Sequence, residues 1–312
     1  MVDSTRRNNR RLVERMVRND DIFCSLLFDQ ENRTIRVIDF RGGNFQTKHN
    51  YLERVLMSEG MRKIFTLIER DDMNGWQRVG YLREGTIPGY YKRSDAYIMS
   101  RIYDEGWSTS LASEDLPVRK NLINDIKDMG SGLSELKGSG VKCEPITEEE
   151  ALELLQGEVA RLNGLTAKAR KAKKEKGAKA VKALPKPSIP LFRQFSRETE
   201  SYYYMAVNRR TKGMNLLGAE YQDCFGNAKV DIYFSPKMRA DRAIARQGLV
   251  SFVDWLANIG AVAIFTLVRA DDLEKNAIYA SAGFRNSGWM NRQRIGTDSS
   301  ADKILWTRKL TQ

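Results

Sequence analysis

Ile-Phe-Thr-Leu-Ile-Glu-Arg-Asp-Asp-Met at residues 64–73 returns as Ile-Phe-Thr-Leu-Val-Arg-Ala-Asp-Asp-Leu at residues 264–273, with six of ten positions identical. A leucine and a glycine recur upstream at one offset, as Leu56 and Gly60 and then as Leu256 and Gly260. Downstream, Trp76-x-x-x-Gly80-Tyr81 is matched by Tyr279-x-x-x-Gly283-Phe284. A helix, a strand and a second helix in matching order indicate two copies of one structural unit.

The repeated apolar run has the pattern of a strand that is buried on both faces. In the first copy we expect strands at 22–28, 34–40 and 63–69, helices near 51–58 and after Asp71 or Asp72 (either aspartate as the cap), and a hairpin at 81–103. In the second we expect a meander of strands at 202–208, 214–222 and 228–234, a long helix to 259, a strand at 262–268, a helix at 273–282, and strands at 284–294 and 303–310. This order predicts an α/β (α+β) protein of two mixed-sheet units, the N-terminal one incomplete.

The rest of the chain divides around these units. Residues 1–103 form the first domain, with a basic N-terminal arm whose Leu12, Val13, Met16 and Val17 have helical spacing. Residues 104–140 form a connector with a helix at 119–129. Residues 141–312 form the second domain, which opens with a strand at 141 and a helix at 147–162.

The net charge of +12 is concentrated in one segment. Residues 166–187 hold nine Lys/Arg against one Glu, so the rest of the chain carries only +4. This Lys/Ala-rich insert has no interleaved aromatic residues for base stacking, which favours a solvated linker over a nucleic-acid site. Binding of nucleic acid through residues 166–187 remains the alternative.

Other residue types limit the protein class. No apolar run approaches the roughly 18–20 residues of a membrane span, so no membrane partner is expected. Cys24, Cys143 and Cys224 are odd in number and lack a CxxC motif, which predicts reduced thiols in a cytoplasmic protein. The only histidine, His49, is expected on a surface turn. One histidine does not favour a Ser-His-Asp triad or a His-rich metal site, and we predict no bound metal.

The element order and Tyr279-Ala-Ser-Ala-Gly283-Phe284 resemble the GNAT superfamily of N-acetyltransferases. More narrowly, the chain resembles the β-lysine N-acetyltransferase family, which joins an incomplete unit to a full one. The residues that carry this resemblance are Gly80-Tyr81, Thr86-Ile87-Pro88-Gly89-Tyr90-Tyr91, Asp95–Ser100, Gly283-Phe284 and Lys303–Leu310. It implies transfer of an acetyl group from acetyl-CoA, as co-substrate, to a primary amine of a small molecule, with an amino acid as one candidate.

The resemblance also implies roles for individual residues. Tyr279 would protonate the departing thiolate, whereas Trp76 at the matching position cannot act as an acid. The cofactor-binding residues would be Met238, Arg239, Ala240, Arg242, Ala243, Val268 and Asn276. Ala240 and Arg242 replace the two glycines expected in the phosphate loop, and Asp241 adds a negative charge there. Glu220 and Asp231 are candidate bases, with solvated strand residues as the plainer interpretation.

One further hypothesis belongs to a different functional class. The altered phosphate loop favours a catalytically silent binding or regulatory protein on the same fold, with a protein partner or a homodimer. Arg41-Gly42-Gly43 offers glycines at the equivalent junction of the first copy, and a plain turn is the favoured interpretation of them.

Overall fold

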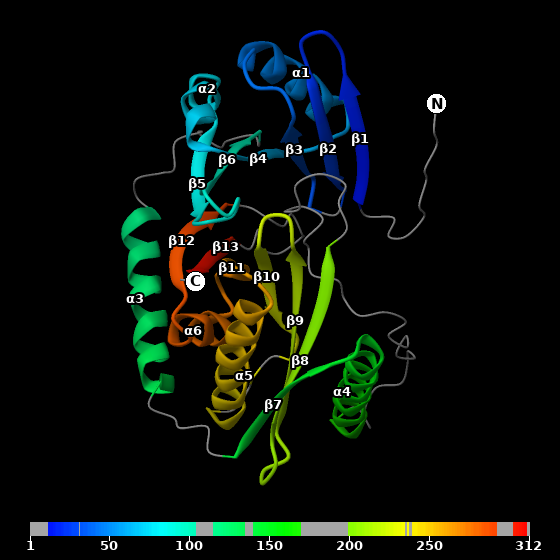
Figure 1. Ribbon diagram of the computed structural model, residues 1–312, viewed down its shortest axis with the longest axis vertical. Helices are drawn as coiled ribbons and strands as arrows, with labels where there is room; N and C mark the ends of the chain where they lie inside the picture. The colour runs from blue at the N-terminus through cyan, green and yellow to red at the C-terminus, as the bar shows by residue number, and fades with distance from the viewer. Residues whose placement is uncertain are drawn as a thin grey trace.

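A computed structural model shows a mixed α/β protein built on one sheet of 13 strands. It describes residues 12–30, 32–103, 115–134, 140–169, 199–234, 236, 239–291 and 302–310. The strand order is β1-β2-β3-β4-β6-β5-β12-β13-β11-β10-β9-β8-β7. Figure 1 shows the first copy above the second, with the sheet continuous between them.

The first copy contains the strands and helices that the repeat predicts. Its elements are β1 (Leu12–Arg18), β2 (Phe23–Asp29), β3 (Thr34–Asp39), α1 (Phe45–Ser58), β4 (Lys63–Ile68), a 3-10 turn (Arg70–Asp72), α2 (Met73–Arg78), β5 (Leu82–Ile87) and β6 (Ala96–Ile102). The pairing of β3 with β4 is parallel, and the other pairings in this copy are antiparallel.

The second copy repeats this order and adds elements before it. After α3 (Asp115–Ser134) come β7 (Val141–Ile146), α4 (Glu148–Ala169), β8 (Glu200–Asn208), β9 (Met214–Gln222), β10 (Asn227–Ile232), α5 (Arg239–Asn258), β11 (Ala263–Arg269), α6 (Leu273–Ser281), β12 (Arg285–Met290) and β13 (Lys303–Lys309). The antiparallel meander β8-β9-β10 and the parallel β10–β11 pair are confirmed. Among the residues that the structure describes, the first copy has no counterpart of β7 or α4, so it is the smaller unit there.

The two copies join edge to edge. β5 of the first copy pairs antiparallel with β12 of the second, and the paired residues are Gly85 and Gly288. Both strands bulge beside this point, between Arg83 and Gly85 and between Asn286 and Gly288. Because Gly85 follows Gly80 by the same five residues that separate Gly288 from Gly283, the junction has the character of a local two-fold axis.

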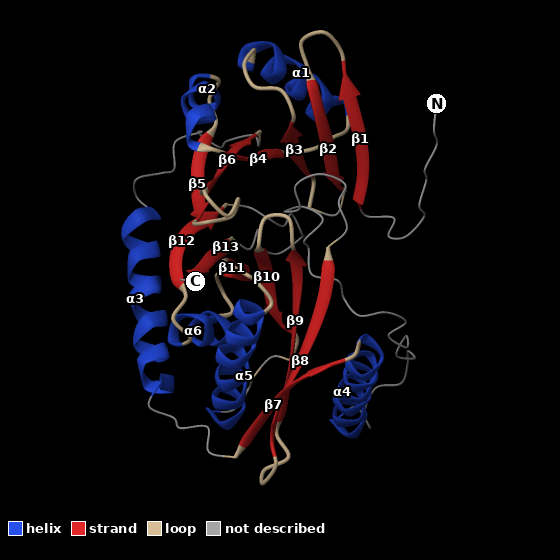
Figure 2. Ribbon diagram, in the orientation of Figure 1, coloured by secondary structure: helices blue, strands red, loops and turns tan. Residues whose placement is uncertain are grey.

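Each repeated strand is buried on both faces, as its apolar run predicts. Ile64 packs in the core beneath α1 and α2, and Ile264 packs in the core beneath α3, α5 and α6. Their neighbours Phe65 and Phe265 point to the other face and share one core formed by both copies. Figure 2 shows the helices flanking the continuous sheet, with α4 covering β8 and β9 on the opposite side from α5.

The glycine that ends the second helix of each repeat has a structural reason. Gly80 and Gly283 have φ of 85° and 83°, a left-handed conformation that favours glycine. The carbonyl just before each glycine accepts a hydrogen bond from an arginine: Val79 O from Arg101 Nη1 at 2.7 Å, and Ala282 O from Arg308 Nη1 at 2.9 Å. The Gly-aromatic motif therefore marks a helix end that is built in the same way twice.

Three local predictions are wrong. Residues 12–18 form strand β1 rather than an amphipathic helical arm, because their backbone pairs along the free edge of β2. In the first copy a 3-10 turn leads into α2, and Asp72 occupies the N-cap position without a side-chain capping bond, so the expected carboxylate cap does not form. Asp272 does cap α6, because its carboxylate accepts a hydrogen bond from Lys275 N at 3.2 Å.

The third wrong prediction concerns His49, which lies buried on α1 and not on a surface turn. Its Nε2 atom is 3.1 Å from Arg101 Nη1, and its ring meets Tyr81 edge to face. Residues 1–11, 104–114, 135–139 and 170–198 lie outside the described residues, so most of the Lys/Ala-rich insert is not described. Within the described ranges, none of the helices combines the length and apolar character that crossing a membrane requires.

Candidate active site

A tyrosine and several charged side chains surround a fork in the sheet of the second copy. β10 and β11 pair at only three positions, ending at Lys229 and Phe265, and then diverge. Beyond this point Ile232 of β10 and Val268 of β11 line a cavity of about 290 Å³ that α6 closes from one side. The cavity lies at the carboxyl ends of two parallel strands, where ligand sites in such sheets form.

The corresponding fork of the first copy opens one residue pair later. β3 and β4 pair at one further position, Val37 with Thr66, and Thr66 Oγ1 also donates to Val37 O at 3.0 Å. Trp76, which replaces the repeat's tyrosine, is fully buried, and the ring of Phe45 packs against it with centroids 5.8 Å apart. The side chain that matches Tyr279 therefore offers no hydroxyl in the first copy.

Tyr279 stands at the base of the open fork. Its side chain is 1 % exposed, and its hydroxyl donates a hydrogen bond to Val230 O at 3.1 Å. Burial, followed by the negative charge of Asp231, raises the pKa of this hydroxyl well above its ordinary value. The phenol therefore keeps its proton near neutral pH and can act as a hydrogen-bond donor.

Asp231 forms the acidic wall of the cavity together with a buried lysine. Lys229 Nζ donates to Asp231 Oδ2 at 2.5 Å, and the lysine side chain is only 3 % exposed. Thr266 Oγ1 lies 3.5 Å from the other carboxylate oxygen. Lys229 and Asp231 are two residues apart on one strand, so their side chains share a face. This pairing fixes the carboxylate beside Tyr279.

The mouth of the cavity is basic. Arg269, Lys275 and Lys303 line it together with Lys229, against the carboxylates of Asp231 and Asp272. Arg269 is oriented by Asp271, whose Oδ1 atom accepts from Arg269 Nε at 2.8 Å. With Asp271, the cavity and its mouth hold four cations against three carboxylates, a net of one positive charge, which suits a ligand that carries negative charge.

Other predicted site residues lie near the fork without facing the cavity. Glu220 is buried on β9, directly opposite Lys229 in the strand register, and does not line the cavity. Asn276 is fully buried in α6: its Nδ2 donates to Arg269 O and Asp272 O, both at 2.8 Å, and its Oδ1 accepts from Trp306 Nε1 at 2.7 Å. The Asn276 carboxamide holds the start of α6 in place.

The predicted phosphate loop lies at the start of α5, apart from the residues that line the cavity. Arg242 Nη1 pairs with Glu274 Oε2 at 2.9 Å, which joins the first turn of α5 to the first turn of α6. Ala240 is exposed, Ala243 is partly buried, and Asp241 adds its carboxylate to the first turn. Met238 lies outside the described residues, and only the backbone of Arg239 is described.

Sequence reasoning overlooked the cations of the fork. Lys229 had a visible signal, because Lys229 and Asp231 alternate with the apolar residues Ala228, Val230 and Ile232. Lys303 had none, because only the return of β13 beside β11 brings it to the cavity. The structure thus brings together Tyr279, Asp231 and Val268 from the predicted set, with four unpredicted basic residues.

Comparisons with known proteins show only low sequence identity and low structural similarity. No protein-family model matches the chain, and no curated protein matches it. Among solved structures, it is similar to the Vibrio cholerae spermidine N-acetyltransferase in complex with CoA and spermine, at 11% identity and a TM-score of 0.36, covering 55% of this chain and 96% of that one. A putative acetyltransferase from Sphaerobacter thermophilus matches at 15% identity and a TM-score of 0.32, covering 56% and 96%.

A third similar structure, the ribosomal-protein-S5-alanine acetyltransferase from Vibrio fischeri, matches at 14% identity and a TM-score of 0.31, covering 35% of this chain and 61% of that one. All three TM-scores lie between 0.31 and 0.36, so this likeness does not support an activity for the chain.

Proposed function

We propose that the fork between β10 and β11 is the active site of an N-acyltransferase that moves an acetyl group from acetyl-CoA to a primary amine of a small molecule. One observation carries the proposal: a buried, protonated Tyr279 lies beside the carboxylate of Asp231 where the sheet opens. Acyl transfer to an amine needs one group that accepts a proton and another that stabilises the leaving atom. The sequence resemblance supports the same reaction.

Each of the two residues has a role that follows from its surroundings. Asp231 would accept, directly or through water, the proton that the amine loses as it attacks. Tyr279 would donate a hydrogen bond to the departing sulfur in place of the one it now gives to Val230 O. Because its pKa is raised, stabilising negative charge on sulfur suits Tyr279 better than complete loss of its proton.

The residues present could bind the phosphates of acetyl-CoA mainly through basic side chains, and less through backbone N–H groups at a helix start. Bound acetyl-CoA would supply the acetyl thioester. Arg269, Lys275 and Lys303 at the cavity mouth would hold its phosphates, and the diverging strands at Ile232 and Val268 would accommodate its narrow arm. At the start of α5, Arg239 would add positive charge, and Arg242 would add more only if it leaves Glu274. The negative charge of Asp241 in the same turn opposes phosphate binding there.

Titration of the purified chain with acetyl-CoA and with CoA by calorimetry tests the proposal. Saturable binding of both is expected, with acetylation of a primary amine detected by mass spectrometry in a panel of amino acids and polyamines. Absence of heat at millimolar acetyl-CoA would contradict the proposal.

A second candidate is a binding or regulatory protein that has lost turnover. The Arg242–Glu274 ion pair and Asp241 favour it, because both weaken the site that α5 offers to a pyrophosphate. This candidate predicts that acetyl-CoA binds weakly or not at all and that no amine in the panel is acetylated.

Several expectations from sequence stay predictions. They are the amino-acid acceptor, the homodimer or protein partner, the cytoplasmic location, the domain boundaries at 103 and 141, and the nucleic-acid alternative for residues 166–187. For the last, binding that weakens steeply with salt and disappears on deletion of the insert is the expected sign.

A further inference from the structure

A second cavity lies where the two copies join. It measures about 440 Å³ and lies between α3 and the β5–β12 junction; we name it the junction pocket. Its lining includes four cations, Arg83, Arg119, Lys120 and Lys127, and one carboxylate, Glu84. It shares no lining residue with the fork between β10 and β11.

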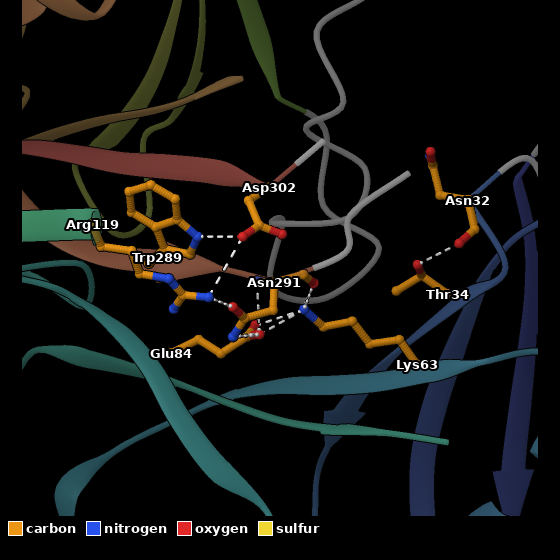
Figure 3. A network of polar contacts seen from close by, with 8 residues as sticks. All are labelled: Asn32, Thr34, Lys63, Glu84, Arg119, Trp289, Asn291 and Asp302. Carbon is orange, nitrogen blue, oxygen red and sulfur yellow. Dashed lines mark hydrogen bonds and ion pairs between the residues drawn. The ribbon is translucent and has the colours of Figure 1, made fainter. Parts of the chain in front are cut away.

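The single carboxylate of the junction pocket is already neutralised. Lys63 Nζ donates to both oxygens of Glu84, at 2.8 and 2.7 Å, and to Asn291 O at 2.7 Å (Figure 3). Asn291 N and Nδ2 also donate to Glu84 Oε1, at 3.0 and 3.1 Å. Glu84 therefore has no charge to spare for the cations that surround it.

Arg119 is held in place at the inner end of the pocket. Its Nη2 atom donates to Asn291 Oδ1 at 2.7 Å and lies 3.5 Å from Asp302 Oδ2. Its guanidinium also lies over the ring of Trp289, 4.9 Å from the centroid, and Trp289 Nε1 donates to Asp302 at 2.6 Å. Asp302 balances Arg119, so this end of the pocket is rigid and close to neutral.

The remaining three cations are not balanced. Among the residues that the structure describes, Arg83, Lys120 and Lys127 have no ion-pair partner; Arg83 only lies over the ring of Tyr97, 5.8 Å from its centroid. Lys120 and Lys127 are seven residues apart on α3 with Asn124 between them, a spacing that places all three on one helix face. That face meets Arg83 across the pocket, so three positive charges converge on one concave site.

We propose that the junction pocket is a second binding site, for a small polyanion such as a molecule with two or more phosphate groups. Three cations on two elements suit a ligand with several negative oxygens, because each oxygen can accept a charge-assisted hydrogen bond. Asn124 and Asn286 add uncharged donors at the rim, and Ile123 and Trp289 give the pocket an apolar wall. The inference is independent of the reaction at the fork.

Binding here would affect both copies. Its walls come from β5 of the first copy and from β12 and α3 of the second. α3 packs closely on α6, where a side chain on Gly130 would come within 3.0 Å of Ala277 O. A ligand that draws α3 toward Arg83 therefore acts on the helix that carries Tyr279.

Calorimetry with inorganic tripolyphosphate tests the site, with citrate as the carboxylate arm. We expect Lys120→Ala/Lys127→Ala to lose affinity for tripolyphosphate by about tenfold or more. Asn124→Glu, an exposed substitution on the same helix face, should produce a similar loss without lowering Tm. Arg78→Ala/Arg210→Ala removes equal charge from exposed positions elsewhere and should leave the affinity unchanged.

Hydrogen exchange locates the bound anion, which matters because residues 166–187 are also basic. Tripolyphosphate should slow exchange in peptides that cover 115–134 and 285–290. Protection confined to other segments, an equal loss in the Arg78/Arg210 variant, or no binding of either anion at millimolar concentration would overturn the proposal. Stronger binding of citrate than of tripolyphosphate would also overturn the assignment to phosphates.

Discussion

Gly85 and Gly288 face each other across the β5–β12 junction, and each holds the same place in its own copy of the repeat. A Cβ atom on Gly288 would lie 2.5 Å from Gly85 Cα and 2.5 Å from Glu84 O, which are backbone atoms that cannot turn aside. A Cβ on Gly85 would lie 2.9 Å from Leu305 Cδ2 and 3.1 Å from Gly288 Cα. The union of the two half-sheets therefore depends on the absence of two side chains.

The first prediction concerns this junction. Gly288→Ala should lower the free energy of unfolding by about 1–3 kcal/mol, because the added methyl group forces the strands apart. Urea unfolding followed by circular dichroism measures the loss. Gly157→Ala is the matched control: it lies in α4 with nothing within 4 Å of the new Cβ, so stability should stay the same or rise. An equal loss in both variants would contradict the steric account.

How much of this molecule the sequence predicts depends on the kind of signal. The apolar repeat at 64–68 and 264–268 predicts buried strands because, apart from Thr66 and Thr266, the side chains on both faces of each run are apolar. The union of β5 with β12 was not predicted, because a strand glycine such as Gly85 looks the same whether it marks a bulge or meets another strand. β1 was missed because Leu12–Arg18 is an exposed edge strand, so side-chain burial leaves no alternation in it.

In the candidate active site, the sequence identified a residue clearly only where that residue belonged to a motif. Tyr279 was found because its spacing to Gly283 is fixed by the helix end that Arg308 braces. Lys303 and the junction pocket depend on which strands become neighbours and on the seating of α3, and residue spacing encodes neither. Glu220 and Asp231 looked equivalent on adjacent strands, and only the divergence of β10 from β11 distinguishes the one that lines the cavity.

Tyr279→Phe removes the hydroxyl at the fork and keeps the ring. Acetylation should slow by roughly 10–1,000-fold, while acetyl-CoA binding by calorimetry should change little, because only the leaving sulfur uses the donor. Tyr91→Phe is the control, since its hydroxyl also donates to a backbone carbonyl, Leu67 O at 3.3 Å, but belongs to the first copy. Equal rates for Tyr279→Phe and the native chain would exclude Tyr279 from the reaction.

The Asp231→Asn variant should be less stable than the double variant Lys229→Met/Asp231→Asn, which removes both charges. The substitution leaves the Lys229 ammonium 3 % exposed and without its carboxylate, at a cost of about 1–3 kcal/mol because Asp231 itself is a quarter exposed. Lys229→Met/Asp231→Asn should recover part of this loss in urea unfolding. If the two single substitutions lower the free energy of unfolding by amounts that simply add in the double variant, Lys229 and Asp231 are not coupled.

Stability should fall as the pH drops below about 6.5 because of His49. Burial, the largest effect, lowers the pKa of His49; Glu53 opposes this, and Arg101 reinforces it. Between the lowered pKa of the folded chain and the ordinary pKa of the unfolded chain, His49 is protonated only when the chain is unfolded. Acidification through this range therefore removes the contribution that neutral His49 makes to the free energy of unfolding above pH 6.5. His49→Gln should flatten this slope, by at most about 1.4 kcal/mol per pH unit, in unfolding measured from pH 7.5 to 5. Because the chain has one histidine, an unchanged slope would contradict the assignment.

Glu84→Gln tests the buried ion pair beneath the junction. Lys63 and Glu84 are each 2 % exposed, and burial lowers the pKa of Lys63, so the ammonium depends on Glu84 to remain charged. Loss of the carboxylate should cost about 3–5 kcal/mol in urea unfolding, whereas Glu144→Gln, which breaks the exposed pair with Lys142, should cost about 0–1 kcal/mol. Lys63→Met/Glu84→Gln should be more stable than Glu84→Gln alone, because it removes the unpaired charge. If it is not, hydrogen bonds from Asn291 to Glu84, and not the ion pair, hold the two copies together here.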